Sequence, residues 1–62
     1  MAEIGMELKL LRVRKGMRQS DVSRETGVPQ CVISRIENGK AEENREAAEV
    51  LRKWYERERT QQ

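Results

Sequence analysis

The clearest local pattern in this chain lies in residues 19–40, which read QSDVSRETGVPQCVISRIENGK. Gly27 and Gly39 divide this stretch into two short segments, because each glycine stands where a helix commonly ends with a left-handed residue. The first segment, Gln19 to Thr26, is only about two helical turns long, and Val22 is its one obvious core residue. We therefore expect a short helix that ends at a turn around Gly27.

The second segment, Pro29 to Asn38, carries Ile33 and Ile36 at the i, i+3 spacing of one helix face. Pro29 suits the first position of a helix, where its missing N–H removes no intrahelical hydrogen bond. Neither segment shows the alternation of β-branched residues that is typical of strands. Together the two segments predict a helix-turn-helix motif over residues 19–38.

On the N-terminal side of this motif, the spacing predicts a helix over Glu3 to Lys15, ahead of Gly16. Leu10 and Val13 fall away from its main face, so this helix is apolar over more than one stripe. The residues that share the main face are Ile4, Leu8, Leu11 and Lys15.

On the C-terminal side, residues 41–59 contain neither Gly nor Pro and predict one long helix over residues 44–59, with Asn44 as its N-cap. Its apolar stripe consists of Ala47, Val50, Leu51, Trp54 and Tyr55. The sequence thus predicts an all-α fold, a small helix-turn-helix bundle of three short helices plus one long C-terminal helix. We expect residues 1–62 to form a single domain.

Length and composition restrict how this domain is stabilised. A chain of 62 residues buries a thin core. Cys31 is its only cysteine and it has no histidine, so we expect neither a disulfide nor a metal site. Oligomerisation is the remaining common source of stability for a chain this short. No segment is apolar enough to span a bilayer, and residues 1–7 do not resemble a signal peptide, so we expect a cytoplasmic protein.

The charge is unevenly distributed along the chain. Residues 1–40 hold eight Lys and Arg against five Asp and Glu, whereas residues 41–62 hold five basic and six acidic residues. A positive N-terminal part suits a polyanionic partner such as nucleic acid, although the excess is modest.

Residues 19–40 strongly resemble the helix-turn-helix family of phage Cro and repressor proteins, which is also called xenobiotic-response-element-like. The resemblance covers roughly residues 6–40. It rests on Gln19 at the start of the second helix, on Gly27 and Val28 in the turn, on the closing residues 33–40 (ISRIENGK), and on Gly16 and Met17 after the first helix.

The resemblance implies that the third helix lies in the major groove of double-stranded DNA, where its N-terminal side chains meet base edges. The base-contacting positions would be Gln30, Cys31, Val32 and Arg35. Glutamine can pair with adenine, arginine with guanine, and valine can touch a thymine methyl group. The alternative for Gln30 and Arg35 is a solvated helix face without a ligand.

The resemblance also implies a set of phosphate contacts. Gln19 matches a glutamine that holds phosphate at the start of the second helix, where free N–H groups favour anions. The other matching positions are Arg18, Asn38 and Lys40. For these residues helix capping and solubility are the alternative roles, and Asn38 would end a helix in any protein.

Two more roles concern Arg12, Glu37 and Cys31. In similar family members, the positions of Arg12 and Glu37 form a partly buried ion pair between the first and third helices. We therefore interpret Arg12 as structural. Cys31 has no histidine to activate it, which argues against catalysis and leaves redox sensing as an alternative.

The C-terminal part departs from the family. The proline that relatives carry after the third helix is absent, and the acidic Glu42 and Glu43 stand where relatives often have basic residues. We therefore expect the long helix to provide a partner surface and hypothesise a homodimer. The expected interface residues are Val50, Leu51, Trp54 and Tyr55.

The sequence favours a sequence-specific regulator of transcription, of phage, plasmid or prokaryotic type, which represses by occupying an operator and is nucleoid-associated when bound. The alternative is an antitoxin-like or other protein-interaction module that uses its C-terminal helix. An enzyme is disfavoured, because no histidine, phosphate-binding glycine loop or paired carboxylates are recognisable. We expect no cofactor, no membrane association and no small-molecule substrate.

Overall fold

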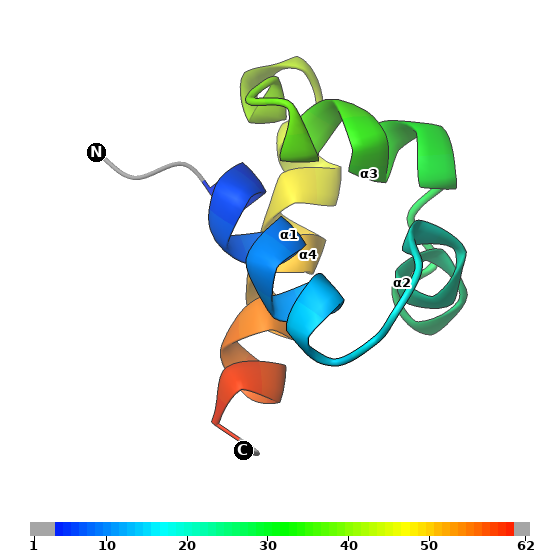
Figure 1. The fold of residues 1–62 in the computed structure, drawn as a ribbon. Coiled ribbons are helices and arrows are strands. Elements are labelled where there is room, and N and C mark those ends of the chain that lie inside the picture. Colours follow the sequence, from blue (N-terminus) through cyan, green and yellow to red (C-terminus); the bar gives the residue numbers. More distant parts are fainter. Residues whose placement is uncertain (1–3, 61–62) are drawn as a thin grey trace.

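The structure is a computed structural model that describes residues 4–60 (Figure 1). Its helical elements are α1 (Ile4–Arg14), α2 (Gln19–Thr26), α3 (Gln30–Glu37), the 3-10 turn η1 (Ala41–Glu43) and α4 (Arg45–Arg59). Strands are absent from the described range. The prediction of an all-α bundle with three short helices and one long C-terminal helix is confirmed.

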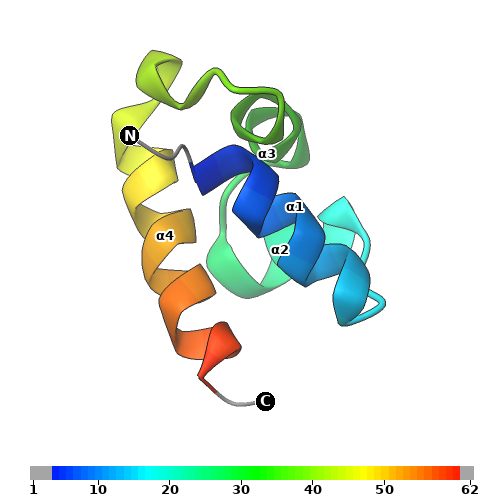
Figure 2. The ribbon, with the colours of Figure 1, turned by 60° about the vertical axis from the view of Figure 1, so that its left-hand side comes forward.

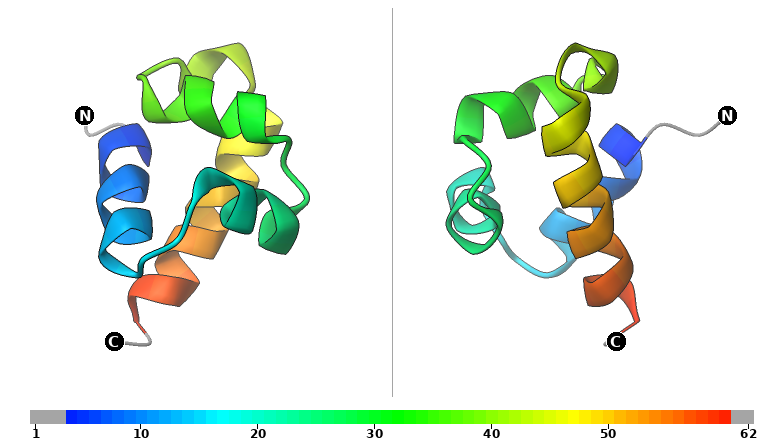
Figure 3. Two further views of the ribbon diagram at one scale, coloured as in Figure 1. Left: turned by 45° about the vertical axis from the view of Figure 1, so that its right-hand side comes forward. Right: turned by 180° about the vertical axis from the view of Figure 1, so that it is seen from behind.

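The four α-helices pack around one centre. Helix α1 lies against both α3 and α4, and α2 packs on α3. Seen from behind, α4 runs across the other helices and contacts each of them (Figure 3). A turn of the view shows α1 and α4 as neighbours, with α3 seen nearly end-on beside the start of α1 (Figure 2). The long helix thus closes the bundle that the first three helices leave open.

The core is small and draws on every α-helix. The side chains that are fully shielded from solvent are those of Leu8, Val22, Ile33, Ile36 and Leu51. Ile4, Met17, Ala47 and Tyr55 pack around it as half-buried residues. The complete set of buried apolar residues is Leu8, Leu11, Val22, Val28, Ile33, Ile36, Leu51 and Trp54.

The turn between α2 and α3 depends on Gly27. Its φ of 80° is left-handed, and its N–H donates to the carbonyl oxygen of Ser23 at 2.8 Å, which closes α2. The hydroxyl of Thr26 donates to the carbonyl of Val22 and accepts from the N–H of Val28. Gly16 and Gly39 also have positive φ, as expected for glycines that end helices.

Helix boundaries differ from the prediction by a residue or so. Pro29 stands at the N-cap of α3, and its carbonyl accepts from the N–H groups of Val32 and Ile33, so the helix itself begins at Gln30. Asn44 caps α4 as predicted, because its side-chain oxygen accepts from the N–H of Ala47 at 3.2 Å. The turn η1 was not predicted, and Glu3, the expected start of the first helix, lies outside the described residues.

Two of the four interface residues expected on α4 are buried in the core. Leu51 and Trp54 are 0% and 2% exposed, because they fill the core of their own chain, so neither is available to a partner. Val50 and Tyr55 lie on opposite flanks of α4. Val50 borders a hollow next to α2, and Tyr55 borders another next to α1. These four residues therefore form no continuous surface.

Candidate nucleic-acid interface

Helix α3 has one buried and one open face. Ile33 and Ile36 are completely buried, which fixes the orientation of the helix about its axis. Gln30, Cys31 and Arg35 are exposed. Three of the four residues expected to contact bases thus share the solvent side of α3. The fourth, Val32, is half-buried and packs against the core, so only part of its side chain is accessible.

The position of α3 is fixed from behind by α1. Gly5 is buried in α1, and a Cβ atom at this position would overlap the carbonyl oxygen of Ile36 and come within 3.3 Å of the backbone of Glu37. The two helices can approach this closely only because residue 5 has no side chain. The sequence alone does not indicate this role of Gly5, since a glycine inside a helical pattern has no partner visible in sequence.

Arg12 and Glu37 form the ion pair that the family resemblance implied. Arg12 Nε and Nη2 donate to the two carboxylate oxygens of Glu37 at 2.8 and 3.0 Å, a two-pronged geometry that fixes both side chains. The side chains are only 12% and 4% exposed. Arg12 Nη1 also donates to the carbonyl of Met17 at 3.1 Å, which ties the turn after α1 to the end of α3.

Gln19 joins this network at the start of α2. Its side-chain amide donates to Glu37 Oε1 at 3.0 Å, so one carboxylate holds groups from both α1 and α2. Within residues 4–60 the second amide hydrogen of Gln19 has no acceptor, so it can bind another group. The contact between Gln19 and Glu37 was missed in the sequence analysis, because the two residues lie 18 positions apart and no local spacing pairs them.

The remaining expected phosphate contacts flank this network. Arg18 is exposed at the N-cap of α2, where its N–H donates to Asp21 Oδ2 at 2.9 Å. Lys40 is exposed after the end of α3. Asn38 is exposed too, but its side chain donates to the carbonyl of Ser34 at 2.9 Å, so capping occupies one of its hydrogens. Arg18 and Gln19 therefore lie at the start of α2, and Asn38 and Lys40 lie just after the end of α3.

Arg35 has an acidic neighbour that the sequence did not point to. Its Nη1 lies 3.2 Å from Oε1 of Glu43 in η1, and both side chains are more than half exposed. Such a pair is weak in water, so Arg35 remains free to exchange this partner for another acceptor.

Two features are absent from the described part of the chain, a cluster of candidate metal ligands and a membrane-spanning helix. Residues 4–60 contain no cluster of three or more side chains that could bind a metal ion. In the same range, no helix is both long and apolar enough to cross a membrane.

Comparison with known proteins agrees with this geometry. A family model described as a helix-turn-helix domain matches residues 3–61. Because the match spans nearly the whole chain, the protein belongs to the helix-turn-helix domain family. This family is consistent with the Cro and repressor type. DNA binding is the activity of this class of protein. Comparison with curated proteins and with solved structures gives no significant match.

Proposed function

We propose that this protein is a sequence-specific regulator of transcription of prokaryotic, phage or plasmid type, which binds double-stranded DNA as a homodimer and represses by occupying its operator in the cytoplasm. In this proposal α3 lies in the major groove, and Gln30, Cys31, Val32 and Arg35 meet base edges.

The observation that carries the proposal is the division of α3 into two faces. Ile33 and Ile36 are fully buried, whereas Gln30 and Arg35, the side chains best suited to base recognition, are exposed on the same short helix. Neither exposed side chain is needed for the core.

Phosphate contacts would come from the ends of the motif. Arg18 and Lys40 are exposed cations, and Gln19 has a free amide hydrogen beside the N-terminus of α2, where the helix dipole favours an anion. Asn38 would contribute its second amide hydrogen. These contacts would set the orientation of α3 on the duplex without reading sequence.

The alternative, a protein-interaction module that uses the C-terminal helix, has less support. Leu51 and Trp54 are buried in the core, so α4 presents mainly charged side chains to solvent. Among the described residues of α4, Val50 is the one large hydrophobic side chain that is exposed.

Selection from a random duplex library at two salt concentrations tests the proposal. The wild type would be compared with Gln30→Ala and Arg35→Ala, and Arg52→Ala is the matched control, because Arg52 is about as exposed as Arg35 but lies on the outer face of α4. We expect an enriched motif for the wild type and the control. Each α3 variant should lose preference at one position and bind the best site about 5- to 100-fold more weakly.

Two results would contradict the proposal. One is binding that depends steeply on salt but enriches no motif. The other is an enriched motif that both α3 variants retain unchanged, which would mean that α3 does not read the bases.

A further inference from the structure

Helix α1 carries an exposed apolar stripe. Met6, Leu10 and Val13 are 61%, 57% and 58% exposed. In the described chain, Val50 is the only other exposed large hydrophobic residue, and it is less open at 42%. Their spacing of i, i+4 and i+7 places them in one row, on the side of α1 opposite the buried Leu8. We call these three residues the α1 stripe.

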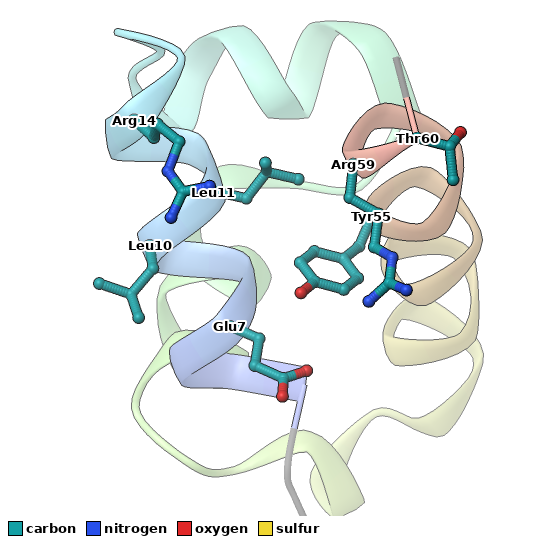
Figure 4. Close-up of a pocket in the computed structure, with 7 residues that line it drawn as sticks. All are labelled: Glu7, Leu10, Leu11, Arg14, Tyr55, Arg59 and Thr60. Carbon is teal, nitrogen blue, oxygen red and sulfur yellow. The ribbon is translucent and has the colours of Figure 1, made fainter. Parts of the chain in front are cut away.

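Two opposite charges border the α1 stripe on the flank nearest α4. Glu7 lies in the first turn of α1 and Arg14 in its last, seven residues or about two turns apart, so both point the same way. Both line a hollow of about 420 Å³ between α1 and α4, together with Tyr55 and Arg59 (Figure 4). Within residues 4–60 neither Glu7 nor Arg14 belongs to an ion pair, unlike most charged residues of α4.

We propose that the α1 stripe is the homodimer interface, and that its occupant is the α1 stripe of a second copy packed antiparallel about a two-fold axis. With the axis at Leu10, this residue packs on the partner's Leu10, and Met6 packs on the partner's Val13. Glu7 then faces the partner's Arg14, and Arg14 faces the partner's Glu7.

The charge pattern selects this occupant. A two-fold axis perpendicular to α1 reverses the helix but keeps each flank on its own side, so an acidic start and a basic end on one flank become reciprocal ion pairs. A parallel copy related by a two-fold axis would instead place each flank against the partner's other flank, where Arg14 would find no acidic side chain. On the other flank Lys9 faces the partner's Lys9 near the axis, and both flexible side chains can turn away to solvent.

The position and size of the surface fit a DNA-binding dimer. In Figure 1, α1 lies on the opposite side of the molecule from α2, so a partner on its outer face leaves the α2–α3 motif open. One face of an 11-residue helix makes a small interface, below about 1,200 Å² in total. We therefore expect weak dimers in free solution. The α1 interface rests on the proposed function, because it is the contact surface of the proposed DNA-binding homodimer. Its test uses protein without DNA, so the interface and the DNA-binding function can fail independently.

Sedimentation equilibrium of the full chain without DNA tests the apolar part. We expect the wild type to dimerise in the micromolar range and Leu10→Glu to weaken association at least about 10-fold, since two buried charges would meet at the axis. Val50→Glu is the matched control, an exposed apolar residue outside the stripe, and should associate like the wild type. Circular dichroism verifies that both variants fold.

Charge reversal tests the antiparallel geometry. Glu7→Arg and Arg14→Glu should each weaken the homodimer about 3- to 10-fold, because like charges then face each other twice. The double variant should recover the wild-type affinity, and an equimolar mixture of the two single variants should form a heterodimer.

Three outcomes would overturn the inference. They are a wild type that stays monomeric at several hundred micromolar, a dimer that Leu10→Glu leaves unchanged, or single charge variants that do not associate when mixed. A dimer weakened by Val50→Glu instead would place the interface beside α2.

Discussion

At the scale of single residues, Glu37 connects three segments of the chain. Its carboxylate accepts from Arg12 and from Gln19, and Arg12 also reaches the carbonyl of Met17. A buried charge is costly unless its hydrogen bonds are satisfied, and here both oxygens of Glu37 have partners. This one side chain therefore holds the end of α3, the body of α1 and the start of α2 in fixed relation.

We predict that Glu37→Gln lowers the free energy of unfolding by about 2–4 kcal/mol, because the Arg12 guanidinium loses its counter-charge while it stays largely buried. Urea denaturation followed by the fluorescence of Trp54, the only tryptophan, measures this directly. The matched control is Glu43→Gln, which removes an exposed partner of Arg35 and should cost less than about 1 kcal/mol.

A double replacement sharpens this prediction. Arg12→Met combined with Glu37→Met removes both charges, and it should be more stable than Glu37→Gln alone, since no ion is left unpaired. Equal or greater loss in the double variant would show that packing rather than charge pairing explains the effect.

At the scale of secondary-structure elements, the close approach of α1 to α3 depends on Gly5. We predict that Gly5→Ala lowers the free energy of unfolding by about 1–2 kcal/mol, although alanine is the better helix former. The reason is the overlap of a Cβ atom with the carbonyl of Ile36. Thermal denaturation followed by circular dichroism provides the measurement.

Lys9→Ala is the control for this change, because Lys9 lies on the exposed side of the same helix. Its stability should stay within about 0.5 kcal/mol of the wild type. A Gly5→Ala variant as stable as the wild type would mean that α1 moves away from α3 without cost.

At the scale of the whole molecule, α4 completes a core that the first three helices cannot close. We predict that Leu51→Ala costs about 2–5 kcal/mol, because it leaves a cavity at a fully buried position. Small domains have little stability to spare, so all helices should melt together at a much lower temperature. Val50→Ala, next to it but exposed, should shift the melting temperature only slightly.

The melting profile of Leu51→Ala shows whether α4 is an accessory helix or part of one core shared with the other helices. If α4 were an accessory helix, Leu51→Ala would leave the α2–α3 motif folded, and circular dichroism would show a partial loss of helix followed by a second transition. One cooperative transition would agree with a single core shared by all four α-helices.

Local rules were enough to derive much of this protein from its sequence. Positive-φ glycines, an N-cap at Asn44 and the helical spacing of Ile33 and Ile36 act over only a few residues, so the four α-helices and the open face of α3 could be predicted. The Arg12–Glu37 pair came from the family resemblance and is present with two-pronged geometry.

Only the tertiary structure decided which apolar side chains remain exposed. Both α4 and the outer side of α1 carry apolar residues at helical spacing, and the sequence predicts a partner surface on α4. Packing buries Leu51 and Trp54 and leaves Met6, Leu10 and Val13 in solvent, because α4 faces the bundle and the outer side of α1 does not. Burial depends on contacts between residues far apart in the chain, which helical periodicity does not encode.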